Sequence, residues 1–307
     1  MDKPLTFSQR EQICERLFAE NGPFWHLYSD GTKMQDIFIC PSDFKMGLNS
    51  LAVCKTTHSK TRILTFEIMN NHFHLILSGA KKDCENFFIA YLEHLKLIFR
   101  SRTNSINWNN FTWELIPIED LRALRNEIIY AHRNAYVAND QFNPFNYPWG
   151  GGCTYFNRRF QEISVCRIED LSLRKKRELC HTKDVDKIKG LKFCGDVVMI
   201  ESFCEVRLGE QLFTNAKSYF NALTKNVEAY SQIAHRIKDS IFLTDDELFK
   251  VAVSLTEKNF GCKMGILNPE QKIQLAKELH YKYNANNQQL RRILKLDIEI
   301  LTELFPS

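Results

Sequence analysis

The sequence predicts an α+β protein, and two observations support this prediction. Between about residue 24 and residue 118, short strand-like runs alternate with segments whose apolar residues recur at three- and four-residue spacing. These are the patterns of strands and helices, respectively. Beyond Tyr155 the helical spacing persists, and the only strand-like run is Val197 to Phe203. We therefore expect a mixed N-terminal half followed by a helical C-terminal region.

The elements of the first half are expected in the order strand, helix, strand, strand, helix, strand. They are expected at Phe24 to Ser29, Gln35 to Cys54, Arg62 to Met69, His72 to Ser78, Lys81 to Arg100 and Phe111 to Ile118. This βαββαβ order is that of a ferredoxin-like domain. A further helix follows, because apolar residues recur at helical spacing from Leu121 to Ile129.

The second half is expected to be helical. Its periodic segments are Leu171 to Cys180, Gln211 to Leu223, Asn226 to Ile237 and Asp245 to Lys258. Thr244 precedes Glu247 by three residues in front of the last of these segments, which is the pattern of a capping box.

The C-terminal residues predict a helix-turn-helix. Pro269 fits the first turn of a helix that runs to about Tyr283, a polar turn follows, and a second helix is expected from Gln288 to Leu296. A short third helix is expected from Ile298 to Phe305, with Asp297 as its N-cap. In a helix-turn-helix the second helix enters the major groove, and it would here present Gln288, Gln289, Arg291 and Arg292. A helical hairpin that only packs on the core is the alternative.

Length and composition limit the remaining possibilities. The 307 residues, of which 44% are hydrophobic, can bury a real core and predict two or three units. The element patterns divide the chain into 1–156 with the mixed fold, 157–262 as a helical middle region, and 263–307 as a helix-turn-helix-like DNA-binding region. The net charge of +4 is too small to indicate a nucleic-acid partner by itself. Ten scattered cysteines without a Cys-x-x-Cys pair, and no long apolar run, predict a reduced cytoplasmic protein without a membrane segment.

Two histidines flank one phenylalanine within a predicted strand. Because strand side chains alternate between faces, His72 and His74 should point the same way. Two imidazoles at this spacing suit a divalent metal, which needs at least one further ligand. A pair of histidines on the polar face of a strand, with no metal, is the alternative.

The predicted helix from Leu121 supplies two further candidates. Tyr130 and Asn134 lie one helical turn apart on one face. The amide oxygen of Asn134 could complete a metal site with two imidazoles, and the phenol of Tyr130 could attack a phosphorus held by the metal. Alternatively, Tyr130 is a core residue and Asn134 a helix C-cap. His132 lies on roughly the opposite face from Tyr130 and is expected at the surface, facing phosphate together with Arg133.

These motifs together resemble a known family. His72-Phe73-His74, the helical Tyr130 with Asn134, and Tyr147-Pro148-Trp149 resemble the single-tyrosine HUH transposases, in particular the REP-associated tyrosine transposases. The resemblance extends from about Trp25 to about Tyr155. The chain departs from the family pattern at Met69-Asn70-Asn71 in place of Met-Pro-Asn, and at Ala135-Tyr136-Val137-Ala138 in place of Pro-Val-Arg-Ala. The second departure removes an arginine that is expected to contact DNA.

The resemblance implies an enzyme that cuts and joins single-stranded or hairpin DNA in transposition and recombination. His72, His74 and Asn134 would hold one Mg²⁺ or Mn²⁺, and Tyr130 would attack to give a 5′-phosphotyrosine and a free 3′-hydroxyl. The active protein could be a monomer or a homodimer. A non-catalytic, domesticated DNA-binding regulator is the alternative, although it would not need all four of these residues. A relaxase or replication initiator with the same chemistry is a third possibility.

Overall fold

A computed structural model describes residues 5–31, 34–100, 106–138, 144–157, 165–225, 233–234, 236 and 243–305. The chain divides into two compact units. The first comprises Met1–Tyr136 with Gln141–Lys225, and the second comprises Val137–Asp140 with Asn226–Ser307. The boundaries expected from the sequence, after residues 156 and 262, differ from this division.

The first unit is built on a four-stranded antiparallel sheet. Its strands are β1 (Phe24–Ser29), β2 (Arg62–Ile68), β3 (Phe73–Ser78) and β4 (Trp113–Ile118). They are arranged in the order β2-β3-β1-β4. The register places Tyr28 and Glu67 on either side of His74 in the sheet. The predicted strand at Phe24 to Ser29 is confirmed, and the other three strands differ from their predicted bounds by at most two residues at either end.

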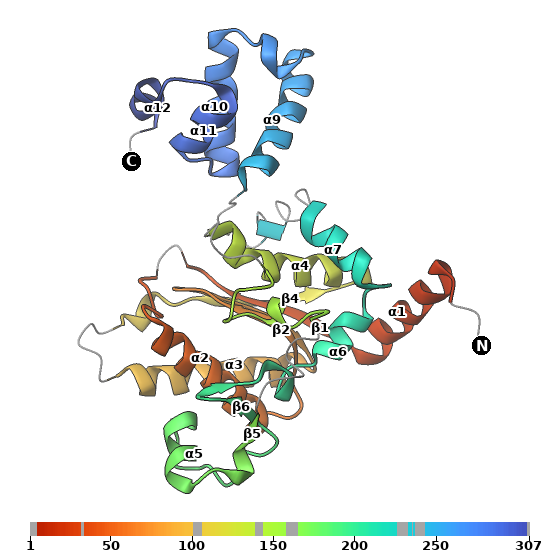
Figure 1. The fold of residues 1–307 in the computed structure, drawn as a ribbon, viewed down its shortest axis with the longest axis vertical. Coiled ribbons are helices and arrows are strands. Elements are labelled where there is room, and N and C mark those ends of the chain that lie inside the picture. Colours follow the sequence, from red (N-terminus) through yellow and green to blue (C-terminus); the bar gives the residue numbers. More distant parts are fainter. Residues whose placement is uncertain are drawn as a thin grey trace. The chain divides into compact units, whose positions relative to one another are not determined.

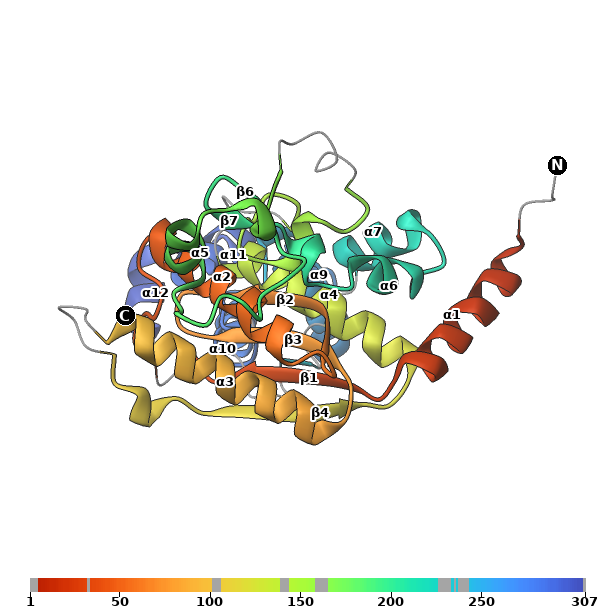
Figure 2. The ribbon, with the colours of Figure 1, turned by 90° about the horizontal axis from the view of Figure 1, so that it is seen from below.

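Helices cover both faces of this sheet. Helix α4 (Leu121–Ala138) lies over one face, and α2 (Pro41–Thr57) and α3 (Lys81–Phe99) lie over the other (Figures 1 and 2). The buried residues of α3 include Cys84, Phe87, Phe88, Tyr91, Leu92 and Leu95. Their three- and four-residue spacing gives α3 one apolar face, which explains why it packs against the sheet.

Helix α2 starts later than the sequence predicts. The backbone N–H groups of Ile37 and Phe38 donate to the carbonyl of Asn70 at 2.7 and 2.8 Å, which holds this segment as a loop. The carboxylate of Asp43 then accepts from the backbone of Ile39 and Cys40, and Pro41 occupies the first helical turn. A proline and an acidic residue in the first turn favour a helix start at this point.

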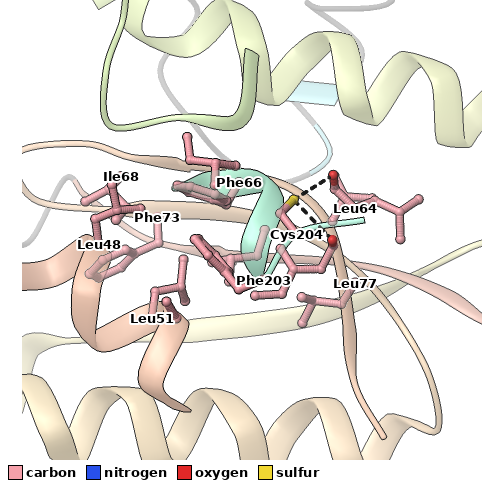
Figure 3. Close-up of a cluster of buried hydrophobic side chains, with 14 of the residues drawn as sticks. Leu48, Leu51, Leu64, Phe66, Ile68, Phe73, Leu77, Phe203 and Cys204 are labelled. Atoms are coloured by element: carbon pink, nitrogen blue, oxygen red, sulfur yellow. Dashed lines mark hydrogen bonds between the residues drawn. The ribbon is translucent and has the colours of Figure 1, made fainter. Parts of the chain in front are cut away.

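The main core lies between the sheet and helices α2 and α3. Figure 3 shows Leu48 and Leu51 of α2 against residues of β2 and β3, with Phe203 inserted from a distant segment. The thiol of the adjacent Cys204 donates to the carbonyls of Ile63 and Leu64 at 3.2 and 3.0 Å. The chain around residue 203 is therefore part of the first unit.

The segment from residue 165 to residue 225 is not wholly helical. It contains a small antiparallel sheet of β5 (Cys166–Arg167), β6 (Lys192–Cys194) and β7 (Val197–Val198). Its helices are α5 (Leu173–Cys180), α6 (Val206–Gln211) and α7 (Ala216–Lys225). The buried Asn49 joins this small sheet to helix α2: its amide donates to the carbonyl of Asp196 at 2.9 Å and accepts from the N–H of Val198 at 2.9 Å. The expected helical region is corrected here: β7 falls within the strand-like run Val197 to Phe203, whereas β5 and β6, with two and three residues, are too short to produce a visible alternation.

An N-terminal helix that was not predicted precedes the sheet. Helix α1 (Phe7–Asn21) begins with a capping box formed by Thr6 and Gln9. The guanidinium of Arg125 binds both carboxylate oxygens of Glu11, at 2.7 and 3.0 Å, and thereby ties α1 to α4.

The second unit consists of helices around a small core of its own. They are α9 (Asp245–Phe260), α10 (Pro269–Tyr283), α11 (Asn287–Leu294) and α12 (Ile298–Leu304). The predicted capping box of Thr244 and Glu247 and the predicted bounds of α10 are confirmed. The helix expected from Asn226 to Ile237 lies almost entirely outside the described residues.

Two expectations about the whole chain can be compared with the structure. All ten cysteines lie within the described residues, and each is a free thiol. Among the described helices, none combines the length and apolar character that crossing a bilayer requires.

Candidate metal and tyrosine site

The sheet face beneath α4 is polar although it is buried. Strand alternation sends apolar side chains toward α2 and α3 and polar side chains toward α4. The buried polar residues contributed by β1, β2 and β3 include His26, Thr65, Glu67 and His74, each at most 1% exposed. Burying such groups costs free energy unless they find partners. A buried layer of this composition therefore points to a function other than packing.

Helix α4 brings three polar side chains to this layer. Glu127, Tyr130 and Asn134 follow one another at three- and four-residue spacing, so they share one face of the helix. All three are buried. The side chain of Asp120 accepts from the backbone N–H of Ala123 at 2.6 Å and fixes the start of this helix.

The three predicted metal ligands meet in the structure. The amide of Asn134 lies between the two imidazoles: its Oδ1 is 3.3 Å from Nε2 of His72, and its Nδ2 is 2.9 Å from Nε2 of His74. The ring centroids of the two histidines are 5.1 Å apart. His72 is partly exposed and lies immediately before β3, whereas His74 and Asn134 are buried.

The hydrogen bonds around His72 determine which of its nitrogens carries a proton. The amide of Asn71 donates to the carbonyls of Gly31 and Met34 at 2.9 and 3.3 Å, so its Oδ1 is the atom that faces Nδ1 of His72 at 2.8 Å. Neutral His72 therefore donates from Nδ1. Its Nε2 then presents a lone pair toward Oδ1 of Asn134, and two acceptors that face each other in this way suit a bound cation.

The electrostatics of His74 favour the same chemistry. Burial, and then the neighbouring His72 and His26, hold the pKa of His74 well below its ordinary range. His74 is therefore neutral at physiological pH. A neutral imidazole is the form that binds metal.

The donor set fits a small divalent cation. Two imidazole nitrogens and one amide oxygen leave further positions for water or substrate oxygens, as a catalytic metal requires. The described residues contain no cluster of three or more histidine, cysteine, aspartate or glutamate side chains suited to a metal. The third member of the candidate set of His72, His74 and Asn134 is an amide and not a carboxylate.

Tyr130 lies beside these ligands. Its ring contacts the ring of His74 edge-on, with the centroids 5.3 Å apart and the planes at 81°, and it approaches His26 at 6.0 Å. The predicted nucleophile and the predicted ligands are therefore neighbours. Tyr130 is 0% exposed. Its side chain is thus enclosed between α4 and the sheet.

The expectation for His132 and Arg133 was wrong, because both side chains are buried, at 0% and 1% exposure. His132 lies 2.5 Å from Oγ1 of Thr65 and 2.8 Å from the hydroxyl of Tyr219, and its ring packs against Tyr155. Burial lowers the pKa of His132 to about 3. Segments distant in sequence cover the outer side of α4, so a position opposite Tyr130 is not a surface position.

Three residues of the buried layer were missed in the sequence. His26 of β1 lies 3.1 Å from His74, measured from Nε2 to Nδ1, and Glu127 of α4 lies 2.9 Å from Nδ1 of His26. Glu67 is paired with His74 across β2 and β3, and burial raises its pKa well above the ordinary value. The three- and four-residue spacing of Glu127, Tyr130 and Asn134 could have identified Glu127 from the sequence. The sequence could not show that His26 lies beside His74, because this contact depends on which strands pair.

The predicted DNA-contacting residues of α11 fall into two groups. Gln288 and Arg291 are exposed. Gln289 completes the capping box with Asn286 and donates to the carbonyl of Leu243 at 2.7 Å, and Arg292 forms an ion pair with Asp245 at 2.5 Å. The latter two residues thus hold α11 to the start of α9. Arg291, Arg292 and Lys295 also line a shallow hollow at the end of α11.

The chain was compared with family models, with curated proteins and with solved structures, and none of them matches it.

Proposed function

We propose that this protein is a metal-dependent, single-tyrosine DNA strand transferase of the HUH type that acts on single-stranded or hairpin DNA. One observation carries the proposal. The amide of Asn134 bridges the imidazoles of His72 and His74, and the ring of Tyr130, from the same helix, packs against His74. A metal site and an adjacent phenol are the two parts that phosphotyrosine chemistry requires.

The arrangement of the sheet supports the same proposal. The antiparallel order β2-β3-β1-β4, with helices α2 and α3 over one face, agrees with a ferredoxin-like βαββαβ plan. We propose that this plan serves as the platform for the two histidines. The helix that follows β4 then carries the tyrosine.

In the proposed reaction the hydroxyl oxygen of Tyr130 attacks the scissile phosphorus. The bond from this oxygen to phosphorus forms, and the bond from phosphorus to the 3′-oxygen breaks. The phenol releases its proton and the 3′-oxygen takes one up, which leaves a 5′-phosphotyrosine and a free 3′-hydroxyl. Because one ester replaces another, the step needs no ATP and can reverse to join strands. A bound Mg²⁺ or Mn²⁺ would neutralise charge on a non-bridging phosphate oxygen.

Tyr136, Tyr147 and Tyr155 are the competing tyrosines near Tyr130, and the structure describes the side chains of the last two. The hydroxyl of Tyr147 donates to the carbonyl of Ile68 at 2.6 Å, and that of Tyr155 donates to the carbonyl of Leu64 at 3.0 Å. Burial raises the pKa of both phenols. These contacts argue against Tyr147 and Tyr155 as the nucleophile.

We further propose that the second unit recognises DNA through a helix-turn-helix formed by α10 and α11. Asn284 ends α10 in the left-handed conformation, and Asn286 caps α11 two residues later. Base contacts would then come from Gln288 and Arg291, because Gln289 and Arg292 are engaged within the unit.

A non-catalytic DNA-binding protein remains the second candidate, and the burial of Tyr130 is the observation that favours it. A covalent adduct separates the two. The protein is incubated with Mn²⁺ and a labelled pool of stem-loop oligonucleotides with random flanks, and the products are run on a denaturing gel.

The wild-type protein should retain label, and Tyr130→Phe should not, while it still binds the oligonucleotides. Tyr28→Phe is the matched control: its hydroxyl, which donates to Glu114 at 2.8 Å, is lost from the same sheet face without any change to the four proposed residues. Retention of label by Tyr130→Phe, or its absence from the wild type under all divalent metals, would refute the enzymatic proposal.

A further inference from the structure

A chain of three buried side chains leads from α4 to one of the candidate ligands. Oε2 of Glu127 lies 2.9 Å from Nδ1 of His26, and Nε2 of His26 lies 3.1 Å from Nδ1 of His74. The exposure of these three residues is 0% or 1%. The chain crosses from a helix to β1 and then to β3.

The atoms of this chain determine where its protons lie. Nδ1 of His26 and Oε2 of Glu127 form a close ion-pair contact, and a negative carboxylate favours a proton on the nitrogen that faces it. In neutral His26 the other nitrogen, Nε2, is then an acceptor, and Nδ1 of His74 must donate to it. His74 is left with a lone pair on Nε2, the nitrogen that faces Asn134 at 2.9 Å.

We propose that Glu127 and His26 are positioning residues, which fix His74 in the tautomer and orientation that offer Nε2 to a divalent cation. The inference rests on the proposed function, because it takes His74 as a metal ligand. Outer partners of this kind raise the basicity of a ligating imidazole and hold its ring in place. Neither His26 nor Glu127 contacts the cation in this arrangement.

The location of Glu127 gives the chain a further role. Glu127 is on α4 together with Tyr130 and Asn134. The tautomer of His74 therefore depends on the docking of the helix that also supplies the nucleophile and the third ligand.

The tautomer can be measured directly on the full-length wild-type protein. Histidine is labelled with ¹⁵N, and long-range correlations between ring nitrogens and ring protons are recorded without metal, with the signals of His74 assigned from the His74→Gln variant. A proton on Nδ1 of His74 is the expected result. A proton on Nε2, which would follow if His26 were doubly protonated and His74 accepted from it, overturns the proposal.

Metal affinity provides the second readout. In His26→Phe, and in Glu127→Met, the dissociation constant for Mn²⁺, measured by calorimetry, should rise about 10- to 100-fold. Glu127→Gln keeps an acceptor oxygen for His26 and should recover part of this loss. An affinity equal to wild type in His26→Phe, with the protein shown to be folded by circular dichroism, overturns the proposal.

Two controls remove polar groups from residues that are not members of the chain, and Tyr28→Phe keeps the ring that packs beside His26. Tyr28→Phe removes a hydroxyl two residues from His26, and His132→Gln removes an imidazole from α4. Both should bind Mn²⁺ as the wild type does, and an equal loss in either would show that the effect is general and overturn the proposal. If the wild type binds no Mn²⁺, the proposed function fails, while the ¹⁵N measurement still decides the tautomer.

Discussion

Asn134 is the residue on which the candidate site depends most, because its single amide group is within 3.3 Å of both ligand imidazoles. Asn71 has a comparable role on the outer side of His72, where it fixes the protonated nitrogen. The amides of Asn71 and Asn134 thus both orient the imidazole of His72. The local motifs His-x-His and Tyr-x-x-x-Asn were enough to predict that these ligands and Tyr130 would be grouped, because each motif needs only the geometry of a single strand or helix.

His72 provides the sharpest test of the ligand set. Its side chain is partly exposed, so His72→Ala should remove a metal ligand with little effect on the midpoint of thermal unfolding. We expect the affinity of His72→Ala for Mn²⁺ to fall at least about tenfold. The affinity of Asn134→Ala should fall less, because a neutral oxygen ligand binds this ion more weakly than an imidazole does. Calorimetric titration measures both, with His58→Ala as a control on a histidine outside the site. Unchanged affinity in His72→Ala would exclude it as a ligand.

His132 should make the stability of the protein depend on pH. Its pKa is about 3 in the folded protein and ordinarily 6.5. Between these values the unfolded chain binds a proton that the folded protein excludes, so the free energy of unfolding falls as pH falls, by up to about 1.4 kcal/mol per pH unit from this group. Above pH 6.5 the group has no effect.

Urea titrations between pH 4 and pH 8 would measure this dependence, with His132→Gln for comparison. The pH slope of the variant should be shallower, because the contributions of other groups are common to both proteins. The raised pKa of Glu67 acts in the opposite direction, since its stabilisation is lost as pH rises through the folded pKa. Equal slopes in the two proteins would contradict the assignment to His132.

Among the elements, α4 differs most from its expected role. The sequence placed His132 and Arg133 of this helix at the surface, but residues 127–135 of α4 are all buried. The outer side is covered by residues 144–157 and by Tyr219 of α7. Periodicity identified the helix and its inner face; it could not show this cover, which comes from segments far away in the sequence. For the same reason His26 and Glu127 were missed, because their meeting depends on strand pairing and helix docking.

The glycines at 150–152 show how closely the covering segment 144–157 approaches the sheet. A Cβ atom on Gly151 would lie 2.2 Å from Oγ1 of Thr65, the hydroxyl that contacts His132. Gly151→Ala should therefore lower the free energy of unfolding by about 1–3 kcal/mol, as expected for overpacking of a buried site. Gly22→Ala is the control, since its Cβ would make only ordinary contacts at 3.5 Å. Chemical denaturation of both variants tests the difference, and equal stability would show that the layer can adjust.

At the scale of the whole molecule, the chain places its two candidate activities in separate units. The candidate metal and tyrosine residues all lie in the first unit, and α9 to α12 lie in the second. The sequence indicated the change of composition near residue 156, but the packing boundary comes at residue 225. The segment between them contributes Phe203 and Cys204 to the first core.

A chain that ends at Lys225 should therefore keep the first unit. We expect it to bind Mn²⁺ with wild-type affinity and to unfold cooperatively, but to bind stem-loop DNA with lower affinity or selectivity, because the proposed recognition helices and the candidate site lie in different units. Competition binding with labelled stem-loops measures the second property. In the full-length protein, Arg291→Ala should reproduce part of this loss of affinity or selectivity for stem-loop DNA. Unchanged DNA preference in both proteins would assign the C-terminal helices a purely structural role.

Glu127, Tyr130 and Asn134 lie on one face of α4, so the three side chains can only move together. A rigid helix cannot withdraw one of these side chains and leave the other two in place. Movement of α4 off the sheet would therefore separate all three side chains from His26, His72 and His74 together. Docking of one helix thus assembles the candidate ligand Asn134, the candidate nucleophile Tyr130 and the carboxylate beside His26, so these three parts are gained or lost as a set.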